Sequence, residues 1–206
     1  MQPSDASAQS LLWAGDPSRS PARNFDGLEQ NPGSITVADD PQGRYGPPFR
    51  FETGDWSNGK ERRESRGLRR PDGSVLRINE SMVGQTVYIG WRALWQPMPN
   101  AQGRWLALFQ LHISGPRPGE PGAGPYVLRT LGDGTLHFQY VTPTGTSRHI
   151  WNTPLRTSTW QTFVIGFKGS HVNVKWGVYP TGPNSGHAVA WLNRPRFGTT
   201  YADVAP

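Results

Sequence analysis

The chain has 206 residues, and its 25 Gly and 20 Pro favour many short strands joined by turns over long helices. It contains no Cys, which excludes disulfide bonds, a thiolate nucleophile and cysteine-ligated metals. The formal net charge of +6 favours a polyanionic partner, which could be an acidic glycan, a nucleic acid or an anionic cell surface.

The N-terminal residues 1–23 are rich in Ser, Ala, Pro, Asp and Gln and lack a regular apolar period, so we predict an irregular arm there. The remaining residues, 24–206, are predicted to form one domain. The apolar run Leu11-Leu12-Trp13 is too short for a signal peptide, and no later segment has the length of a membrane span. The chain therefore shows no recognisable signal peptide and no predicted membrane span.

Short strands are predicted from Ile35 onward, and turn dipeptides separate them. Residues 85–95 alternate most clearly, with Val87, Ile89 and Trp91 on one face, which we predict to be the core face. This pattern predicts an all-β sandwich. The turns are predicted at Asp72-Gly73, Asp133-Gly134 and Thr144-Gly145, and further strands over 104–114, 136–141, 162–168 and 172–178, the last two as a hairpin across Gly169-Ser170.

A charged strand segment, Glu61-Arg62-Arg63-Glu64-Ser65-Arg66, is the first candidate functional feature. The two-residue period of a strand places Arg62, Glu64 and Arg66 on one face. Such a row can grip a sugar carboxylate through charge-assisted hydrogen bonds while Glu64 orients the Arg side chains. The alternative is a solvated charged edge that deters aggregation.

The second candidate feature is Gln110-Leu111-His112, where two polar side chains share one face of an apolar strand. The opposite face, with Trp105, Ala107 and Phe109, is predicted to be core. A buried unpaired amide costs about 1–3 kcal/mol, so the polar pair needs internal partners or a wet surface. A satisfied core histidine is the alternative to a functional one.

Together the two features resemble a known enzyme family. Arg62-Arg63-Glu64-Ser65-Arg66 resembles the R-x-E-x-R strand motif of alginate lyases, and Gln110-Leu111-His112 is similar to their Q-[IV]-H motif. The opening segment with Phe49-Arg50-Phe51-Glu52-Thr53 looks like that of heparin and glucuronan lyase-like proteins, and Trp160-Gln161-Thr162-Phe163-Val164 looks like a later strand of theirs. The resemblance covers roughly residues 24–180.

This resemblance implies a concanavalin-like jelly-roll sandwich of two antiparallel sheets that binds a uronic-acid polymer and cleaves it by β-elimination. In such lyases Arg and Gln neutralise the substrate carboxylate, while His or Tyr acts as base and acid. The implied catalytic residues here are Arg62, Gln110 and His112, and Arg66 and Glu64 are implied to bind substrate.

The catalytic tyrosine of alginate lyases comes from a C-terminal Y-F-K-A-G-x-Y strand, which residues 194–206 do not reproduce. By its position Tyr201 is the predicted substitute, and Tyr179 is the other candidate. Trp151, in turn-rich polar surroundings, could stack on a sugar ring, as could Trp56, and Lys175 could extend a basic groove. Residues 116–125 read as a long loop that either walls the groove or only connects strands. No cofactor motif and no metal-ligand spacing occur, so none is predicted.

Two hypotheses therefore stand. The first is a lyase-like protein that acts outside the cell on an acidic polysaccharide. The second is a non-catalytic carbohydrate-binding or bacteriophage virion component, for which residues 1–23 could contact neighbouring subunits or a second copy, and which the missing C-terminal motif favours. A nucleic-acid partner is disfavoured because the basic residues are scattered. The enzyme hypothesis predicts that Arg62, Gln110, His112 and one tyrosine converge.

Overall fold

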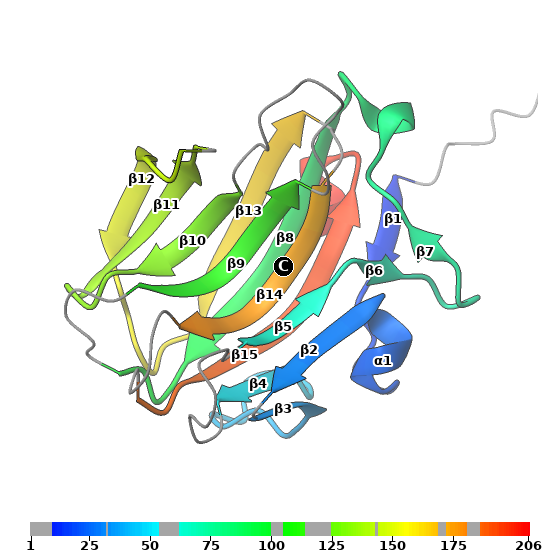
Figure 1. Cartoon of the computed structure of the whole chain (residues 1–206). Helices are drawn as coiled ribbons and strands as arrows, with labels where there is room; N and C mark the ends of the chain where they lie inside the picture. Colours follow the sequence, from blue (N-terminus) through cyan, green and yellow to red (C-terminus); the bar gives the residue numbers. More distant parts are fainter. Residues whose placement is uncertain are drawn as a thin grey trace, which may run out of the picture.

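The structure is a computed structural model that describes residues 10–31, 33–53, 62–99, 105–113, 125–142, 144–168, 172–180 and 186–206. Two antiparallel sheets stack face to face, with the seven-stranded sheet in front of the six-stranded one in Figure 1. The described part of the chain is thus almost entirely β, and the predicted fold class, a sandwich of two antiparallel sheets, is confirmed.

The six-stranded sheet has the order β13-β8-β15-β4-β3, and β1 also pairs with β15. The first half of β15 pairs with β4 and its second half with β1, so the two short strands follow each other along one edge of β15. The strands are β1 (Leu11–Ala14), β3 (Gly33–Val37), β4 (Phe49–Thr53), β8 (Thr86–Trp95), β13 (Gln161–Lys168) and β15 (Val189–Gly198).

The seven-stranded sheet has the order β12-β11-β10-β9-β14-β5-β2. A separate ribbon of β6 (Leu68–Arg69) and β7 (Val75–Leu76) lies beside it (Figure 1). The strands of the sheet are β2 (Gly27–Asn31), β5 (Arg62–Arg66), β9 (Leu106–Ile113), β10 (Tyr126–Thr130), β11 (Thr135–Val141), β12 (Ser147–Pro154) and β14 (Val172–Pro180). The short helices are α1 (Pro21–Asn24), η1 (Glu80–Met82) and α2 (Tyr201–Val204).

Aromatic side chains fill the core between the sheets, as the alternation of β8 predicts. Trp91 of β8 stacks on Phe109 of β9 with 4.5 Å between ring centroids, and Trp176 of β14 stacks on Trp13 of β1 at 6.1 Å. All four are buried. Burying such large apolar surfaces contributes roughly 1.5–3 kcal/mol per side chain, which offsets the modest hydrophobic content of the chain.

The structure tests several of the predicted connections. The three turn dipeptides are confirmed, because Gly73, Gly134 and Gly145 have φ values of +89°, +75° and +83° and connect paired strands. The predicted hairpin of residues 162–168 with 172–178 is wrong. Although both segments are strands, β13 pairs with β8 in one sheet, and β14 pairs with β9 and β5 in the other. The turn predicted at Gly169-Ser170 lies outside the described residues.

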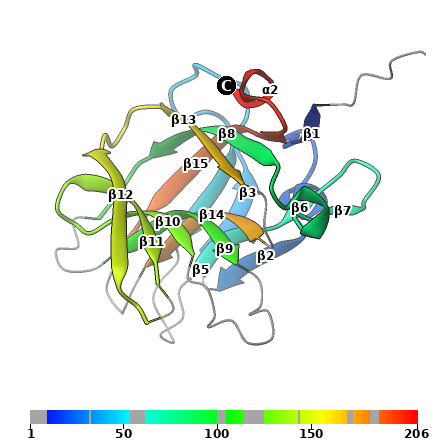
Figure 2. The same ribbon diagram turned by 90° about the horizontal axis from the view of Figure 1, so that it is seen from above.

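The two ends of the described chain pack on the six-stranded sheet. Residues 11–14, predicted as part of an irregular arm, form β1, and Trp13 is 3% exposed. Helix α2 contacts β15 and β8 and lies on the side of this sheet that is turned away from the other sheet (Figure 2). Within the described ranges, none of the helices has the length and apolar character needed to cross a membrane.

Candidate functional site

Polar side chains gather on the outer face of the seven-stranded sheet, which we call the polar face. Strand pairing settles which residues share it: Glu29 lies opposite Glu64, and Gln110 lies opposite Lys175. Alternation along β5 adds Arg62 and Arg66. The polar face as used below comprises Glu29, Arg62, Glu64, Arg66, Trp105, Gln110, His112, Arg129, Gln139, Lys175 and Tyr179.

Glu64 is the buried centre of the polar face, with a fully buried side chain. Its Oε1 accepts a hydrogen bond from Gln110 Nε2 at 2.5 Å. In the described structure its Oε2 accepts no hydrogen bond and has only ion-pair contacts, with Arg62 Nε at 3.3 Å and Lys175 Nζ at 3.8 Å. Burial raises the pKa of Glu64 to about 7, although both cations and Gln110 act in the opposite direction.

Glu29 lies on β2 directly across from Glu64, which would place two like charges side by side. The buried Lys175 relieves this repulsion, since its Nζ is 3.2 Å from Glu29 Oε1 and also contacts Glu64. Burial by itself would raise the pKa of Glu29, but Lys175 and Arg62 outweigh it and hold that pKa below its ordinary value. Lys175 is therefore buried and forms ion pairs with two carboxylates of the polar face, and its predicted role in extending a basic groove stays a prediction.

Arg62 contacts both the buried Glu64 and the partly exposed Glu29. Its Nη1 donates to Glu29 Oε2 at 3.2 Å, and its guanidinium carbon lies 3.9 Å from the centroid of the Tyr179 ring. Burial by itself lowers the pKa of Arg62, but Glu64 and Tyr179 raise it above its ordinary value. The guanidinium is thus held in one place as a permanent cation, which is the arrangement needed to bind an anion.

His112 follows Gln110 on the same face and is exposed, next to Asn173 of β14. The alternative of a histidine sealed in an apolar core is therefore wrong. Gln110 itself is buried, and its amide Nε2 donates one hydrogen bond to Glu64. The two polar residues of β9 therefore differ. The Gln110 amide is buried and hydrogen-bonded, whereas the His112 imidazole is exposed.

Arg66 lies on the same face, two residues after Glu64 on β5, but its side chain is exposed. One other predicted site residue, Trp151, lies elsewhere. Trp151 pairs with Phe138 on the core-facing side of β12 and lines a 450 Å³ cavity with Phe163 between the sheet edges, so it cannot stack on a sugar at the polar face. Trp56 lies outside the described residues, as does the predicted loop up to residue 124.

Tyr201 is not part of this site. It begins α2 and contacts Tyr88 of β8 with 6.5 Å between ring centroids, on the outer side of the six-stranded sheet (Figure 2). The whole sandwich separates it from His112. The prediction that Tyr201 is the catalytic tyrosine is therefore wrong, since position along the chain does not decide which sheet a residue packs against.

Tyr179, the other candidate, does lie at the site. It follows Lys175 and Gly177 on β14, between the two strands that carry the recognised motifs. The signal was present in the sequence, because Lys175, Gly177 and Tyr179 reproduce the K-x-G-x-Y spacing of the Y-F-K-A-G-x-Y motif, which we expected only within residues 194–206. Gly177 is required there: it has φ +150°, and a Cβ would lie 1.8 Å from the Arg63 carbonyl oxygen.

Trp105 is a further member that the sequence pattern misplaced. The pairing of β9 with β10 shifts register between Leu128 and Arg129, where β9 supplies one residue more than β10. This bulge reverses the alternation, so Leu106 and Leu108 join the core while Trp105 packs edge-on against Tyr179 at 5.2 Å. The core position predicted for Trp105 is therefore wrong.

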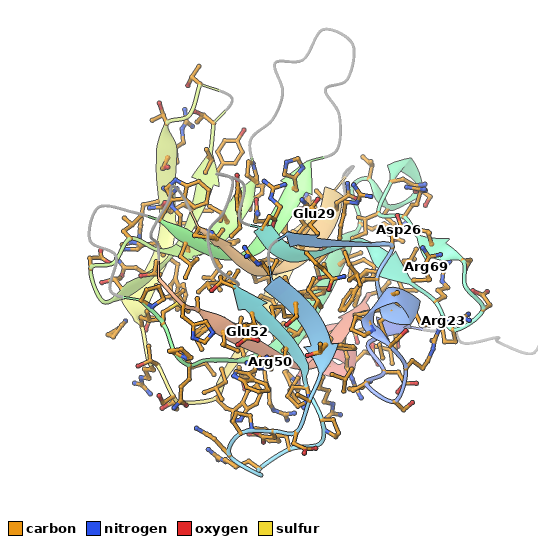
Figure 3. All side chains as sticks on the ribbon, turned by 60° about the horizontal axis from the view of Figure 1, so that its bottom comes forward. Arg23, Asp26, Glu29, Arg50, Glu52 and Arg69 are labelled. Carbon is orange, nitrogen blue, oxygen red and sulfur yellow. The ribbon has the colours of Figure 1, made fainter. Side chains whose placement is uncertain are left out.

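The charged groups on the two sheets are separate. Figure 3 shows Glu29 on β2 in one layer and Arg50 and Glu52 on β4 in the other. Arg50 Nη1 is 2.6 Å from Glu52 Oε2, and His187 also contacts Glu52, so this second group is an internally paired ion cluster. Among the described residues, no three His, Asp or Glu side chains are grouped so that they could hold a metal ion.

Comparisons with known proteins agree with this architecture. No protein-family model matches the sequence, and no curated protein matches it significantly. Among solved structures, the endo-β-1,4-glucuronan lyase from the fungus Trichoderma reesei has a TM-score of 0.67 at 14% identity, over 96% of this chain and 99% of that one. Alginate lyase A1-II′, a member of polysaccharide lyase family 7, has a TM-score of 0.58 at 17% identity, over 88% and 99%.

These structural neighbours are jelly-roll polysaccharide lyases, so the resemblance and fold class inferred from the sequence are confirmed. At such low identity the likeness establishes the fold. It leaves the activity to be argued from the side chains of the polar face.

Proposed function

We propose that the polar face binds an acidic, uronate-containing polysaccharide and cleaves it by β-elimination. The observation that carries this proposal is the gathering of Arg62, Gln110, His112 and Tyr179 on one face around the buried Glu64. A cation, an amide, an accessible imidazole and a phenol are the groups that this reaction needs. An extracellular or virion-surface location, as expected from the sequence, is part of the proposal.

The chemistry begins at the carbon next to the sugar carboxylate. A base removes the proton of that carbon, a C=C bond forms to the neighbouring carbon, and the glycosidic C–O bond on that neighbour breaks, so the leaving oxygen takes up a proton. Negative charge builds on the carboxylate during the first step. Arg62 and Gln110 stabilise it, and the Glu64 carboxyl holds both side chains in place.

His112 and Tyr179 are the candidates for the two proton transfers. His112 is exposed, and an imidazole that a substrate can reach is an effective proton acceptor near neutral pH. Tyr179 contacts Arg62, whose charge stabilises a phenol oxygen that becomes negative as it passes its proton to the leaving group. Which of the two is the base depends on the face of the sugar that is attacked.

The test uses two pairs of matched variants. Wild-type protein is incubated with alginate, glucuronan and heparin while the ultraviolet absorbance of the unsaturated uronate product is followed. We expect Tyr179→Phe and His112→Ala each to reduce the rate by about 10²-fold or more, as the loss of a general acid or base does. Their controls, Tyr201→Phe and His187→Ala, alter the same residue types on the other sheet and should retain the wild-type rate.

Each other outcome has a defined meaning. Equal loss in Tyr201→Phe, or full activity in Tyr179→Phe, contradicts the assigned roles. If the wild-type protein binds a uronate polymer but yields no product from any, β-elimination is wrong and the non-catalytic carbohydrate-binding hypothesis takes its place.

A further inference from the structure

Arg129 of β10 differs in its partners from Arg62 and Lys175, the other cations of the polar face that are partly or fully buried. Its Nε donates to Gln139 Oε1 at 2.9 Å, and its Nη2 donates to Ser147 Oγ at 2.8 Å. Both partners are neutral. In the part of the chain that the structure describes, no carboxylate forms an ion pair with Arg129.

Arg62, in contrast to Arg129, has acidic partners. It lies between two carboxylates, Glu29 and Glu64, which compensate its charge. A partly buried cation without such compensation is costly, because it gives up hydration without gaining an ionic partner. Burial lowers the pKa of Arg129, and no acid among the described residues opposes the effect, which agrees with its uncompensated charge. A site of this kind gains most from an external anion.

A row of aromatic rings connects the two arginines. Arg62 lies over Tyr179 at 3.9 Å, Tyr179 packs edge-on against Trp105 at 5.2 Å, and the Arg129 guanidinium carbon lies 5.9 Å from the Trp105 ring. Strands β5 and β10 are three steps apart in the sheet, which corresponds to roughly 14 Å. That span exceeds a single sugar ring.

We propose that Arg129 and Trp105 form a second anion subsite on the polar face, which binds another carboxylate of the polyuronate chain held at Arg62. This inference rests on the proposed function and deepens it: the ligand is an acidic oligosaccharide long enough to cross from β5 to β10. Trp105 supplies an apolar surface for a sugar between the two carboxylates, and the guanidinium of Arg129 still has donors beyond those used by Gln139 and Ser147.

The experiment measures the affinity of uronate oligosaccharides of increasing length by titration calorimetry. For wild-type protein we expect affinity to increase from the disaccharide to longer oligomers that reach both cations. In Arg129→Gln this gain should be lost, so that long oligomers bind about tenfold more weakly while the disaccharide binds as before. Arg148→Gln, which removes an exposed cation from β12, is the matched control and should behave as wild type.

Thermal unfolding of each variant shows whether Gln139 and Ser147 still hold β10, β11 and β12 together. If Arg129→Gln is unfolded, Arg129→Met, which keeps the aliphatic stem, is measured instead with the same expected result. Undiminished binding of long oligomers by the folded variant would overturn the subsite. Failure of the wild-type protein to bind any uronate would instead overturn the proposed function itself.

Discussion

The carboxyl group of Glu64 is buried, and two cations, Arg62 and Lys175, lie next to it. Burial raises its pKa more than the two cations lower it. Its pKa of about 7 lies above the ordinary value of 4.5. Between these two pH values the folded state holds a proton that the unfolded state releases. The contribution of Glu64 to the free energy of unfolding therefore decreases as pH rises through this window.

We predict that Glu64→Gln flattens this decrease. Between pH 5 and pH 8 the difference in unfolding free energy between the variant and the wild type should change by about 1–3 kcal/mol, in favour of the variant at the higher pH. Urea unfolding at several pH values measures it. Glu52→Gln is the control: hydrogen bonding from Arg50 keeps the pKa of Glu52 below its ordinary value, so its effect should appear only at lower pH. Parallel wild-type and Glu64→Gln curves would contradict a raised pKa.

Individual residues also show which members of the polar face the sequence motifs identify and which they miss. The alternation of β5 placed Arg62 and Glu64 on one face of that strand, and the alternation of β9 did the same for Gln110 and His112, as the structure has them. Their catalytic and binding roles remain predictions. Glu29, in contrast, carries no motif and was missed, because its importance comes from its position opposite Glu64 on a strand more than thirty residues away.

At the scale of strands, the bulges of β9 and β14 determine which of their side chains lie on the polar face. The register of β14 against β9 shifts between Trp176 and Tyr179, next to the close approach of Gly177 to β5. The bulge in β9 opposite this point keeps Leu106 and Leu108 in the core. An unbroken two-residue alternation would place these leucines on the polar face and Trp105 in the core.

Replacement of Gly177 tests the role of this close approach. We predict that Gly177→Ala destabilises the fold by about 3 kcal/mol or more, since its Cβ would meet backbone atoms of Arg63 and Glu64. Gly145→Ala is the matched control: φ there is also positive, at +83°, but nothing lies within 4 Å, so we expect about 1 kcal/mol. Chemical denaturation gives both values. Equal costs at the two positions would show that strand approach at Gly177 is unimportant.

For the whole molecule, the net charge of +6 predicts how ligand binding responds to salt. If the polar face binds a polyuronate, its affinity should fall by about tenfold when NaCl is raised from about 20 to about 200 mM, because salt screens exposed charges such as Arg66. Titration with a carboxyl-reduced, uncharged form of the same polymer is the control. Salt-independent binding of the acidic polymer would argue against recognition through charge.

The sequence by itself determined the fold class, three turns, the two motifs of the polar face and the strands β5, β8, β9, β11, β13 and β14. These features depend on local rules: the two-residue period of a strand and the positive φ that Gly permits in a turn. The same locality explains why the alternation of residue types was enough to assign Arg62 and Glu64 to one face of β5, and Gln110 and His112 to one face of β9.

Only the tertiary structure decided which strands are neighbours, and with them the composition of the site. Sheet order placed β14 between β9 and β5, brought Tyr179 to Arg62 and left Tyr201 on the other sheet. It also placed Arg129 beside Trp105 and without an acidic partner among the described residues. Such pairings join segments far apart in the chain, and their free energy depends on packing and register across the whole sandwich, which no local pattern encodes.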